Sequence, residues 1–449
     1  MNDPLAFVRD RAPWLVDPSL GTCVVGSAAL AVACREAGVP GPAPQDLDLS
    51  WLPEPDRGRA LLEEHRVFVP TTEGNVDRGT LALRLDGRRV EITTLLAGEP
   101  RLPLGQRIAR DLAERDMTIG AVAVEVATGR IHDPHEGLAD WQARRIVAVG
   151  DPAQRIAVHP IRWLRYYRKA HQLGFTLDNR IRAIGADPRQ LRLLPVEAVA
   201  LELRAILLQC ASPGRCLHEL HECGVLASLA PELARQFDGR PAGPQRWHPE
   251  VSQALHLILA LEWAAAHTAD LDERDRFAVL LAVLCHDLGK GYTRPEDLPG
   301  HPGHDDEGVR HVQRLLDRWP GFADARARML SEHVCKLHQL VRRLHELRAG
   351  TLARVYEQWF RPRDYPLELF AIAVAADSAG RLGRAGDGEA VRVRLRSELS
   401  SLREVAGAVD AAAVRTRHPD DLEAFRAALH EERAKAIAAH RGEIIGPAT

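Results

Sequence analysis

Two patterns of apolar residues divide the chain. The first ~120 residues carry short apolar runs such as CVVGSAAL, LALRL and RVEITTLL, separated by Gly/Pro-rich stretches. Short apolar runs bounded by turn residues are typical of strands in a small α/β domain. From Glu197 onward, stretches such as VEAVALELRAILLQ and RFAVLLAVLCHDL repeat apolar residues at helical spacing. The pattern therefore predicts an α/β head followed by all-helical domains.

A Pro/Gly-rich segment, FDGRPAGPQRWHPE, interrupts the helical region between Gln236 and Trp247 and predicts a domain boundary there. A chain of 449 residues, at ~150 residues per domain, is long enough for about three domains. We expect a head over residues 1–125, a helical neck and body over 126–240, a second helical domain over 246–400 and a helical tail over 401–449.

Composition limits the class of protein. With 45% hydrophobic and 27% charged residues, the chain has the composition of a soluble globular protein. No run approaches the ~20 apolar residues that span a bilayer, and the N-terminus lacks the layout of a signal peptide. We therefore expect a cytoplasmic protein without a membrane partner. The seven cysteines are scattered without a C-x-x-C, so the sequence indicates neither a disulfide framework nor a thiolate zinc site.

Positive charge is concentrated in one segment. The formal net charge is −3, yet residues 141–192 hold eleven Lys or Arg against three Asp, a local charge of +8. This concentration favours a phosphate-rich partner. A solvated basic face explains the charge equally well, so charge alone leaves both interpretations open.

A first group of candidate residues follows a Gly-Ser turn. Gly26 and Ser27 stand between a strand-like run and a helix-length segment, and Asp46 and Asp48 come next. Residues i and i+2 of a strand face one side, so these carboxylates could hold a divalent ion together, with Glu91 as a third acid. Two Mg²⁺ ions at such acids support nucleotidyl transfer, and N–H groups at a helix start approach phosphates. A D-x-D pair alone is more often a solvated turn.

The order of motifs resembles the polymerase-β-type head of bacterial class II tRNA nucleotidyltransferases, the family of CCA-adding enzymes and poly(A) polymerases. Arg115, Asp116 and Thr118 match its R-D-x-T segment, DPHEGLADW matches its D-P-x-x-G-x-x-D-L, and HPIRWLRYYRKAHQLGFTLD resembles its next helix. The resemblance covers residues ~20–225. It implies a small mixed sheet, an all-α neck and body that bind RNA and nucleotide, and nucleotide contacts at these residues: Gly26, Ser27, Arg115, Asp116, His159 and Arg162.

The chain departs from this family where nucleotides are handled. The family's G-G-x-V-R-D reads GSAALA from Gly26, without its Arg and Asp. Val158 and His159 replace the Glu-Asp pair that templates bases, and Arg162 remains. An Asp accepts from a base amino group and an Arg fork donates to the ring, whereas a neutral His accepts one hydrogen bond. These departures favour an altered substrate or a head that has lost its chemistry.

A second group of candidates has the spacing of metal ligands. His256 lies in a helix-like run, His286 and Asp287 close another, and Asp377 lies in a third. Imidazole and carboxylate ligands suit Mn²⁺, Fe²⁺, Ni²⁺, Co²⁺ or Zn²⁺, whose bound water becomes a nucleophile near neutral pH. A lone helical His is usually a core residue, but the order H…HD…D resembles the HD phosphohydrolase superfamily. We expect Lys290 to contact a phosphate. We expect His304 and His338 to bind either a second metal ion or substrate phosphates.

The helical part resembles the C-terminal domain of the multifunctional CCA-adding enzymes of proteobacterial type, which implies phosphatase, 2′-nucleotidase and 2′,3′-cyclic phosphodiesterase activities. The leading hypothesis is a tRNA nucleotidyltransferase that uses ATP or CTP and Mg²⁺ on tRNA or another RNA 3′ end, with an appended HD phosphohydrolase over 246–400. The second hypothesis makes the HD domain the working part and the head a scaffold or a transferase of changed substrate. A noncatalytic RNA-binding protein is the third, and a homodimer stays open.

Overall fold

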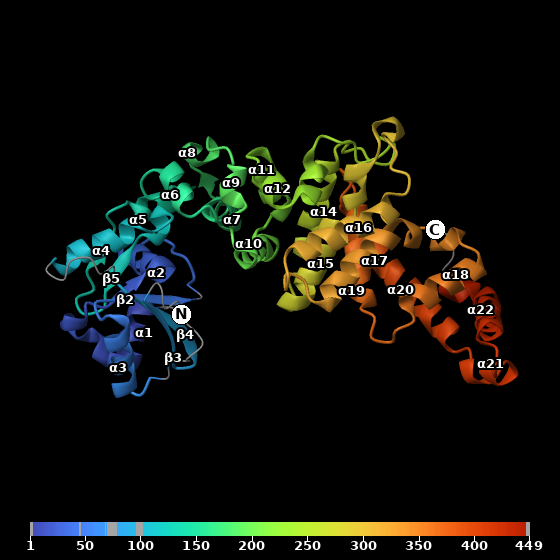
Figure 1. Ribbon diagram of the computed structural model, residues 1–449, viewed down its shortest axis with the longest axis horizontal. Helices are drawn as coiled ribbons and strands as arrows, with labels where there is room; N and C mark the ends of the chain where they lie inside the picture. The colour runs from blue at the N-terminus through green and yellow to red at the C-terminus, as the bar shows by residue number, and fades with distance from the viewer. Residues whose placement is uncertain (1–2, 45, 68, 70–78, 96–101, 446–449) are drawn as a thin grey trace. The chain divides into compact units, whose positions relative to one another are not determined.

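The computed structural model describes residues 3–44, 46–67, 69, 79–95 and 102–445 (Figure 1). It divides into two compact units, residues 1–185 and 186–449. The division falls inside the segment expected to form the neck and body. The boundaries expected near residues 125, 240 and 400 stay predictions, and the helix α20 (Asp387–Gly407) runs through the last of them.

A mixed sheet organises the first unit. Its six strands are β1 (Cys23–Val25), β2 (Leu47–Trp51), β3 (Thr80–Leu85), β4 (Arg88–Thr94), β5 (Ala123–Glu125) and β6 (Ile131–His132), in the order β3-β4-β2-β1-β5-β6. Only the pair β2–β4 is parallel; the other neighbours are antiparallel. A parallel pair needs a crossover connection, and the segment between β2 and β4, with a helix and β3, supplies it. The small mixed sheet expected for the head is confirmed.

Short helices surround this sheet and continue beyond it. They are α1 (Pro4–Arg11), α2 (Gly26–Glu36), α3 (Pro55–Glu64), α4 (Leu104–Ala113), α5 (Gly137–Gln142), α6 (Pro152–Val158), α7 (Arg162–Leu173) and α8 (Asn179–Arg182). A core cluster around Val25, Ile108 and Leu112 joins β1 to α4. The expected all-α neck omitted one detail, a parallel pair of two-residue strands, β7 (Arg145–Ile146) and β8 (Thr176–Leu177).

The described part of the second unit contains helices and no strand. Its helices are α9 (Pro188–Leu191), α10 (Val196–Gln209), α11 (Pro213–Glu222), α12 (Val225–Leu229), α13 (Pro231–Ala234), α14 (Gln253–His267), α15 (Glu273–Cys285), α16 (His304–Arg318), α17 (Ala325–Val341), α18 (Ala349–Val355), α19 (Leu367–Ala379), α20, α21 (Ala411–Arg417), α22 (Leu422–Ala439) and α23 (Arg441–Ile444). A 3₁₀ helix, η6 (Leu288–Tyr292), follows α15, and a π-helix, η9 (Tyr356–Phe360), follows α18.

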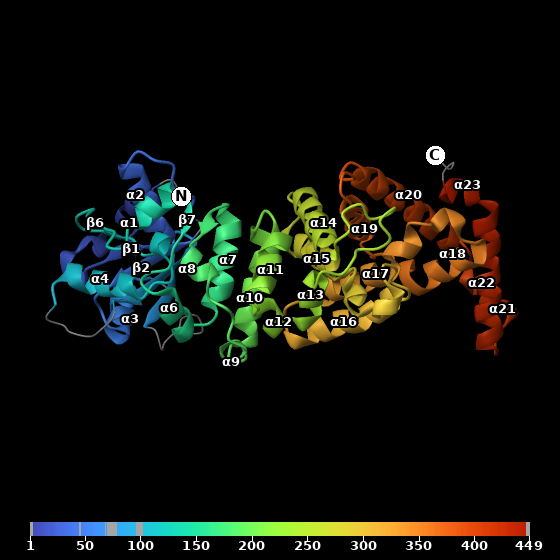
Figure 2. The ribbon, with the colours of Figure 1, turned by 90° about the horizontal axis from the view of Figure 1, so that it is seen from above.

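The helix α19 forms the centre of this unit. All its residues except Glu368 are buried, as expected for a helix that is apolar on every side. It packs against α14, α15, α17 and α20 (Figure 2). Gly380, which directly follows α19, lets the chain approach α14 closely, since a β-carbon there would lie 2.9 Å from Cβ of Ala260 in α14. The all-α body and HD region expected from the sequence are confirmed.

Among the helices that the structure describes, none is both long enough and apolar enough to cross a bilayer.

Candidate functional site

The acidic residues of the head converge on one face of its sheet. Asp48 in β2 pairs in register with Glu91 of the parallel strand β4. Residues that pair across neighbouring strands share a face, so the two carboxylates are neighbours. Asp46 is exposed just ahead of β2 and two positions before Asp48, which places it on the same side. The structure thus brings together the three acids expected from the sequence.

The electrostatics of this cluster suit a cation. Burial raises the pKa of the Asp48 carboxyl, and the negative charges of Glu91 and Asp46 raise this pKa further, whereas Arg115 opposes the increase. Crowded carboxylates repel one another unless a cation lies between them, and hard divalent ions prefer such oxygen ligands. The cluster therefore fits a divalent metal ion, which Asp46 and Asp48 would hold.

The start of α2 lies directly against these acids. A β-carbon on Gly26, whose φ is +67°, would lie 3.8 Å from Oδ2 of Asp48. The N–H of Gly26 already donates to the carbonyl of Val122 at 3.2 Å, and Ser27 is exposed. Helix N-termini leave their first N–H groups without intrahelical partners, so contact with a phosphate would fall to the residues after Gly26.

Arg115 and Asp116 lie at the junction between the head and the following helices. Nη2 of Arg115 pairs with Oδ2 of Asp111, one turn earlier in the chain, at 3.1 Å. Oδ1 of Asp116 accepts a hydrogen bond from the N–H of Met117 at 2.9 Å. The backbone carbonyl of Asp116 accepts one from the hydroxyl of Tyr166 at 3.0 Å. Asp116 therefore fixes α7 to the head, and its predicted nucleotide contact stays a prediction.

Arg162 is buried, and its guanidinium contacts backbone carbonyls. Nη1 donates to the carbonyl of Arg155 at 3.0 Å and Nη2 to that of Glu114 at 2.9 Å. These bonds tie the first residue of α7 to the segment after α4. His159, by contrast, is exposed at the end of α6. The structure therefore gives Arg162 a structural function that the sequence did not predict, and the nucleotide contacts of both residues stay predictions.

Part of the positive charge between residues 141 and 192 is paired within the unit. The ion pairs of these basic residues include Arg145 with Asp140 at 2.7 Å, Arg155 with Glu114 at 2.9 Å and Arg180 with Asp178 at 2.8 Å. The sequence count of +8 therefore overstates the charge available to an external phosphate group, because paired guanidiniums are partly neutralised.

The segment DPHEGLAD builds the junction before α5. Both oxygens of Asp133 accept N–H bonds from the first turn of α5, from Gly137 at 2.7 Å and Leu138 at 2.9 Å. Asp140 accepts a hydrogen bond from the hydroxyl of Thr118 at 2.7 Å. These contacts explain the two aspartates of the motif by local structure, because each carboxylate accepts hydrogen bonds from nearby donors.

Gly137→Ala should lower the free energy of unfolding by about 2–3 kcal/mol, since overpacking a tight contact costs about 1–3 kcal/mol. A β-carbon at residue 137 would lie 2.2 Å from the carbonyl oxygen of Thr118, a backbone atom that cannot rotate away. Urea denaturation measures the change. Gly185→Ala is the matched control, because a β-carbon there meets nothing within 4 Å. Equal stability of the two variants would contradict the close contact.

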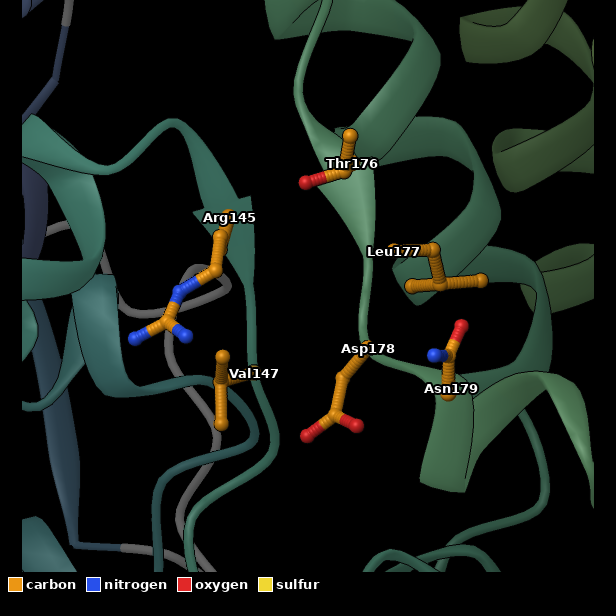
Figure 3. A pocket seen from close by; sticks show the side chains of 6 residues that line it. All are labelled: Arg145, Val147, Thr176, Leu177, Asp178 and Asn179. Atoms are coloured by element: carbon orange, nitrogen blue, oxygen red, sulfur yellow. The ribbon is translucent and has the colours of Figure 1, made fainter.

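A polar pocket of about 320 Å³ lies beside β7 and β8 (Figure 3). Its lining residues are Arg145, Val147, Thr176, Leu177, Asp178 and Asn179. Asp178 accepts the N–H of Arg180 at the start of α8 at 2.8 Å, and both charged side chains of the lining are in ion pairs. None of the nucleotide-binding residues expected from the sequence lines this pocket.

In the second unit, the four residues of the predicted HD set meet in the core. His256 lies in α14, His286 directly follows α15, Asp287 precedes η6, and Asp377 lies in α19. None is more than 3% exposed. Four segments that are far apart in the sequence therefore deliver polar side chains to one buried point, where each needs a partner.

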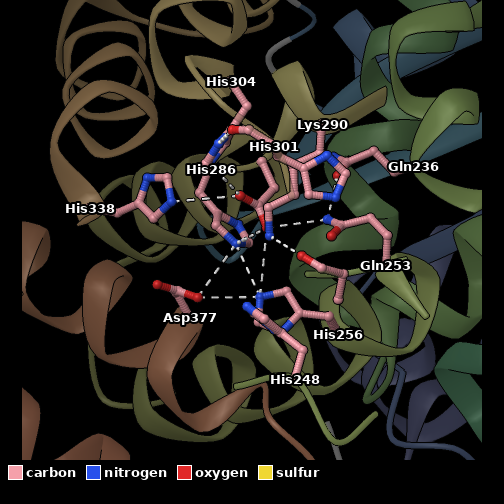
Figure 4. Close-up of polar contacts among 12 residues, drawn as sticks. Gln236, His248, Gln253, His256, His286, Lys290, His301, His304, His338 and Asp377 are labelled. Atoms are coloured by element: carbon pink, nitrogen blue, oxygen red, sulfur yellow. Dashed lines mark hydrogen bonds and ion pairs between the residues drawn. The ribbon is translucent and has the colours of Figure 1, made fainter. Parts of the chain in front are cut away.

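The distances between these side chains are those of a preformed metal site. Nε2 of His256 lies 3.3 Å from Oδ1 of Asp377 and 3.7 Å from Oδ2 of Asp287. Nε2 of His286 lies 3.0 Å from the same oxygen of Asp287 and 3.4 Å from Nε2 of His256. Figure 4 shows the two imidazoles and Asp377 facing one another. Two imidazole nitrogens and two carboxylate oxygens form a donor set that suits a borderline divalent ion.

His304 and His338 approach the other oxygen of Asp287. Their Nε2 atoms lie 3.4 Å and 3.6 Å from Oδ1 of Asp287. Oδ1 of Asp287 is buried and makes no hydrogen bond of ordinary geometry to the described residues. A cation bound between Asp287, His304 and His338 would give this oxygen a partner. Burial lowers the pKa of His338 to about 4, so its imidazole is neutral at pH 7, the form that binds metals.

Backbone carbonyls fix the orientation of three imidazoles. Nδ1 of His286 lies 2.7 Å from the carbonyl of Val283, and Nδ1 of His304 lies 2.7 Å from that of His301. Nδ1 of His338 lies 3.1 Å from the carbonyls of Val334 and Cys335. A carbonyl only accepts, so Nδ1 carries the proton and Nε2 presents its lone pair to the centre.

Glu250 anchors the fourth imidazole, and sequence reasoning missed it. Its Oε1 lies 3.1 Å from Nδ1 of His256 and 2.8 Å from Nδ1 of His248, and its Oε2 accepts the N–H of Leu382 at 3.2 Å. Burial opposes ionisation, but these bonds outweigh it and lower the pKa of Glu250 to about 2. A single carboxylate in a loop belongs to no periodic pattern that would mark it in the sequence. Its one sequence feature is the segment His-Pro-Glu, residues 248–250, shortly before α14.

Lys290 and Arg342 supply positive charge to the two carboxylates. Nζ of Lys290 lies 2.7 Å from Oδ2 of Asp287 and donates to the carbonyl of Ala242 at 2.7 Å. Its predicted contact with a substrate phosphate stays a prediction. Arg342, which the sequence did not single out, donates from Nη1 to Oδ2 of Asp377 at 2.9 Å and is 27% exposed. Lys290 is thus a buried counter-ion, and Arg342 extends from the site toward solvent.

Both carboxylates are held in the ionised form. Burial raises the pKa of Asp287, but the neighbouring His286 and Lys290 outweigh burial and hold that pKa well below its usual value. Burial likewise opposes ionisation of Asp377, and Arg342 and the hydrogen bond to His256 lower its pKa well below the usual range. Ionised carboxylates are the metal-binding form.

Metal binding to the metal-free protein at pH 7 should release about one proton per ion, because ligands bind in the deprotonated form. Burial opposes protonation of His256, but its hydrogen bonds to Asp377 and Glu250 raise its pKa to about 9. The imidazole is therefore protonated at pH 7, and apparent metal affinity should increase as pH rises toward 9. Isothermal titration calorimetry in buffers of different ionisation enthalpy measures the proton. His345→Gln, a surface variant, should behave as wild type, and a heat independent of buffer would refute this expectation.

Two domain families match the chain. Residues 39–147 match the poly A polymerase head domain, and residues 254–375 match the HD domain. Both kinds of domain depend on divalent metal ions. The multifunctional CCA protein of Pasteurella multocida (strain Pm70) is 33% identical over 282 residues. This alignment covers 62% of the present chain and spans slightly under two thirds, 65%, of that relative.

Solved structures share the fold at low sequence identity. The Bacillus stearothermophilus CCA-adding enzyme in complex with CTP superposes with a TM-score of 0.64 at 19% identity, over 98% of this chain and 94% of that one. A further CCA-adding enzyme with CTP gives a TM-score of 0.61 at 15% identity, over 100% and 95% of the two chains. A tRNA nucleotidyltransferase with a primer tRNA and an ATP analogue gives 0.53 at 17% identity, over 86% and 96%.

A nucleotidyltransferase-type head joined to an HD domain therefore defines the class of this protein. Within that class, the chain is similar to the class II tRNA nucleotidyltransferases, the CCA-adding enzymes and poly(A) polymerases, with a C-terminal HD domain. The resemblance expected from the sequence is thus confirmed.

Proposed function

We propose that this chain is a tRNA nucleotidyltransferase that adds nucleotides of the CCA sequence to RNA 3′ ends and carries an HD phosphohydrolase in its second unit. The observation that carries the first activity is the in-register pairing of Asp48 with Glu91, with Asp46 two residues away. The names of the relatives, a multifunctional CCA protein and CCA-adding enzymes with CTP or ATP, support the choice of reaction.

In the head, Asp46 and Asp48 would hold Mg²⁺, which activates the attacking 3′-hydroxyl and neutralises the triphosphate. Glu91 borders both residues and adds negative charge that favours a cation. Arg115, whose charge reaches Asp48, would hold a phosphate of ATP or CTP. The start of α2 from Gly26 lies against Asp48 and would bring backbone N–H groups to the same phosphates. Basic residues of the segment 141–192 would contact the RNA backbone without reading its sequence.

In the second unit, His256, His286, Asp287 and Asp377 would hold a transition metal ion, such as Ni²⁺, Mn²⁺, Co²⁺ or Zn²⁺, which lowers the pKa of a bound water and makes it a nucleophile. Glu250 and the backbone carbonyls keep the imidazole lone pairs directed at the centre. His304 and His338 would bind a second ion or a substrate phosphate, and Lys290 would neutralise Asp287. The partly exposed guanidinium of Arg342 would meet a phosphate that enters from solvent.

The first experiment supplies tRNA that lacks its terminal CCA to the purified protein with Mg²⁺, and labelled CTP and ATP separately and together. Ordered addition of C, C and A would support the proposed reaction and would show that bases are selected despite Val158 and His159. The same preparation is tested with 2′,3′-cyclic nucleotides. No addition together with hydrolysis of the cyclic substrate would refute the head activity and leave the HD activity in place.

The completeness of the HD centre favours a second candidate function, a 2′,3′-cyclic phosphodiesterase or phosphatase whose head is a scaffold or has changed substrate. The predicted HD ligands form two adjoining groups of three, His256 with His286 and Asp377, and Asp287 with His304 and His338, and within each group the ligand atoms lie within 4.8 Å of one another. In the head, by contrast, Val158 and His159 replace the base-templating acids. Addition of a nucleotide other than C or A, or to an RNA other than tRNA, would favour the form in which the head has changed substrate.

A further inference from the structure

A pocket of about 720 Å³ lies near the C-terminal end of the second unit, apart in sequence from both metal clusters. Its lining residues come from four segments: Tyr356, Arg361, Arg363, Ser400, Arg403, Glu404, Gly407, Ala411 and Arg433. We propose that this pocket binds the phosphate groups of a small polyphosphate-bearing anion, of the kind found in a nucleoside diphosphate or triphosphate. The proposal does not rest on the function proposed above.

Positive charge dominates the lining. Four arginines stand against one carboxylate, Glu404. Arg361 and Arg363 are exposed in the segment after η9, and Arg403 lies on the facing side of α20. Nη1 of Arg403 donates to the carbonyl of Arg363 at 3.1 Å, which fixes the segment to the helix. Planar guanidinium forks from several elements around one concave space can donate paired hydrogen bonds to the several acceptor oxygens of phosphate groups.

One of these arginines has an unsatisfied donor. Arg433 of α22 is 7% exposed, and its Nε is buried without a hydrogen-bond partner among the described residues. Its Nη1 pairs with Glu357 at 3.1 Å, and its guanidinium lies over the ring of Tyr356, 5.2 Å from the centroid. A buried N–H that lacks an acceptor is unfavourable, and Arg433 lines the pocket. An anionic oxygen in the pocket would supply the missing acceptor.

The backbone around the pocket is unusual in a way that favours a ligand site. Tyr356 begins η9, and Arg361 follows its last residue. Single turns of π-helix are rare in proteins and are frequent at functional sites. On α20, the lining residues Ser400, Arg403 and Gly407 are spaced to share one face of the helix. The pocket is therefore built on the helices α20 and α22 and on the π-helical turn η9.

The size of the pocket favours a small molecule over a strand of nucleic acid. Its volume of about 720 Å³ lies within the range of about 300–1,000 Å³ that is typical of small-ligand sites. Four guanidiniums exceed what a single phosphate requires, so a ligand with two or three linked phosphates fits the charge better.

The test measures binding of inorganic tripolyphosphate to the full-length protein by isothermal titration calorimetry, in EDTA and near-physiological salt. The wild type should bind, and Arg361→Gln/Arg403→Gln should weaken binding at least about tenfold, since each lost charge-assisted bond is strong. Arg433→Lys, which keeps the charge but removes Nε, should weaken it severalfold. Arg426→Gln, an exposed residue of α22 outside the lining, should bind as wild type.

Equal tripolyphosphate affinity in the wild type and in Arg361→Gln/Arg403→Gln overturns the proposal, as does absence of binding to a wild-type protein that melts cooperatively. A parallel filter-binding assay with tRNA lacking CCA separates the sources of phosphate. Loss of tRNA affinity in the double variant, with no tripolyphosphate binding by the wild type, assigns the pocket to the RNA backbone and also overturns the proposal.

Discussion

Asp48→Asn should reduce nucleotide addition at least about 10³-fold in kcat/KM, because loss of a metal ligand removes several kcal/mol of charge stabilisation and about 1.4 kcal/mol corresponds to a tenfold rate change. The substitution keeps the shape of the side chain and therefore the strand β2. Transfer of labelled CMP or AMP to tRNA lacking CCA measures the effect. Hydrolysis of 2′,3′-cyclic nucleotides by the same variant should be unchanged.

The direction of the pKa shift at Asp48 separates a catalytic effect from a folding effect. Burial and the neighbouring acids raise this pKa, which means that the charged carboxylate is less favourable in the folded metal-free protein than in the unfolded chain. Neutral Asn should therefore leave the free energy of unfolding equal or higher. Asp10→Asn, at an exposed site of the same unit, is the control for both measurements. A folded Asp48→Asn variant with wild-type transfer would exclude this cluster as the catalytic centre.

Local spacing was enough to predict the elements of the head site. The order of strand, Gly-Ser turn, helix and D-x-D gave β1, α2 and β2, because each depends on a few consecutive residues. The pairing of Asp48 with Glu91 was less accessible, since it joins strands 43 positions apart with a helix and a strand between them. Register across such a crossover is set by packing of the whole sheet, which the sequence does not display.

The HD ligands were predictable because helices keep their histidines and aspartates at fixed intervals. The sequence did not predict that Asp287 uses one oxygen toward His286 and the other toward His304 and His338. That arrangement depends on how α15, α16 and α17 pack. Glu250 was missed for a related reason. It acts on His256 through a hydrogen bond made in a buried loop, and a Glu in a loop is normally expected to be exposed.

Charge was the weakest guide to function. The basic segment suggested an external phosphate partner, yet Arg162 bonds to backbone carbonyls and other arginines pair with local acids. A count of basic residues does not show which guanidiniums have internal partners, since these partners lie as far away as 48 or 49 positions in the sequence. Conversely, the arginine pocket near the C-terminus combines residues 361 and 433, a separation at which no sequence pattern indicates proximity.

Asp287→Asn should abolish metal binding by the second unit and reduce its phosphohydrolase activity at least about 10³-fold, because this carboxylate faces both sets of histidines and charge at the metal is worth several kcal/mol. It should also destabilise the metal-free protein by about 3–5 kcal/mol, since Lys290 would keep a buried charge without its counter-ion. Metal content after gel filtration and hydrolysis of 2′,3′-cyclic nucleotides measure the first two effects.

His338→Gln keeps this prediction testable if Asp287→Asn fails to fold. His338 is neutral at pH 7 because burial lowers its pKa to about 4, so its loss leaves no unpaired charge and should cost little stability. The variant loses a ligand of the second set only and should keep the ion held by His256, His286 and Asp377. Asp306→Asn, 76% exposed in the same unit, is the control. Full metal content in His338→Gln would exclude Asp287, His304 and His338 as a second metal site, whether or not Asp287→Asn folds. Full metal content in a folded Asp287→Asn as well would make the whole cluster a structural network and place the hydrolase activity elsewhere.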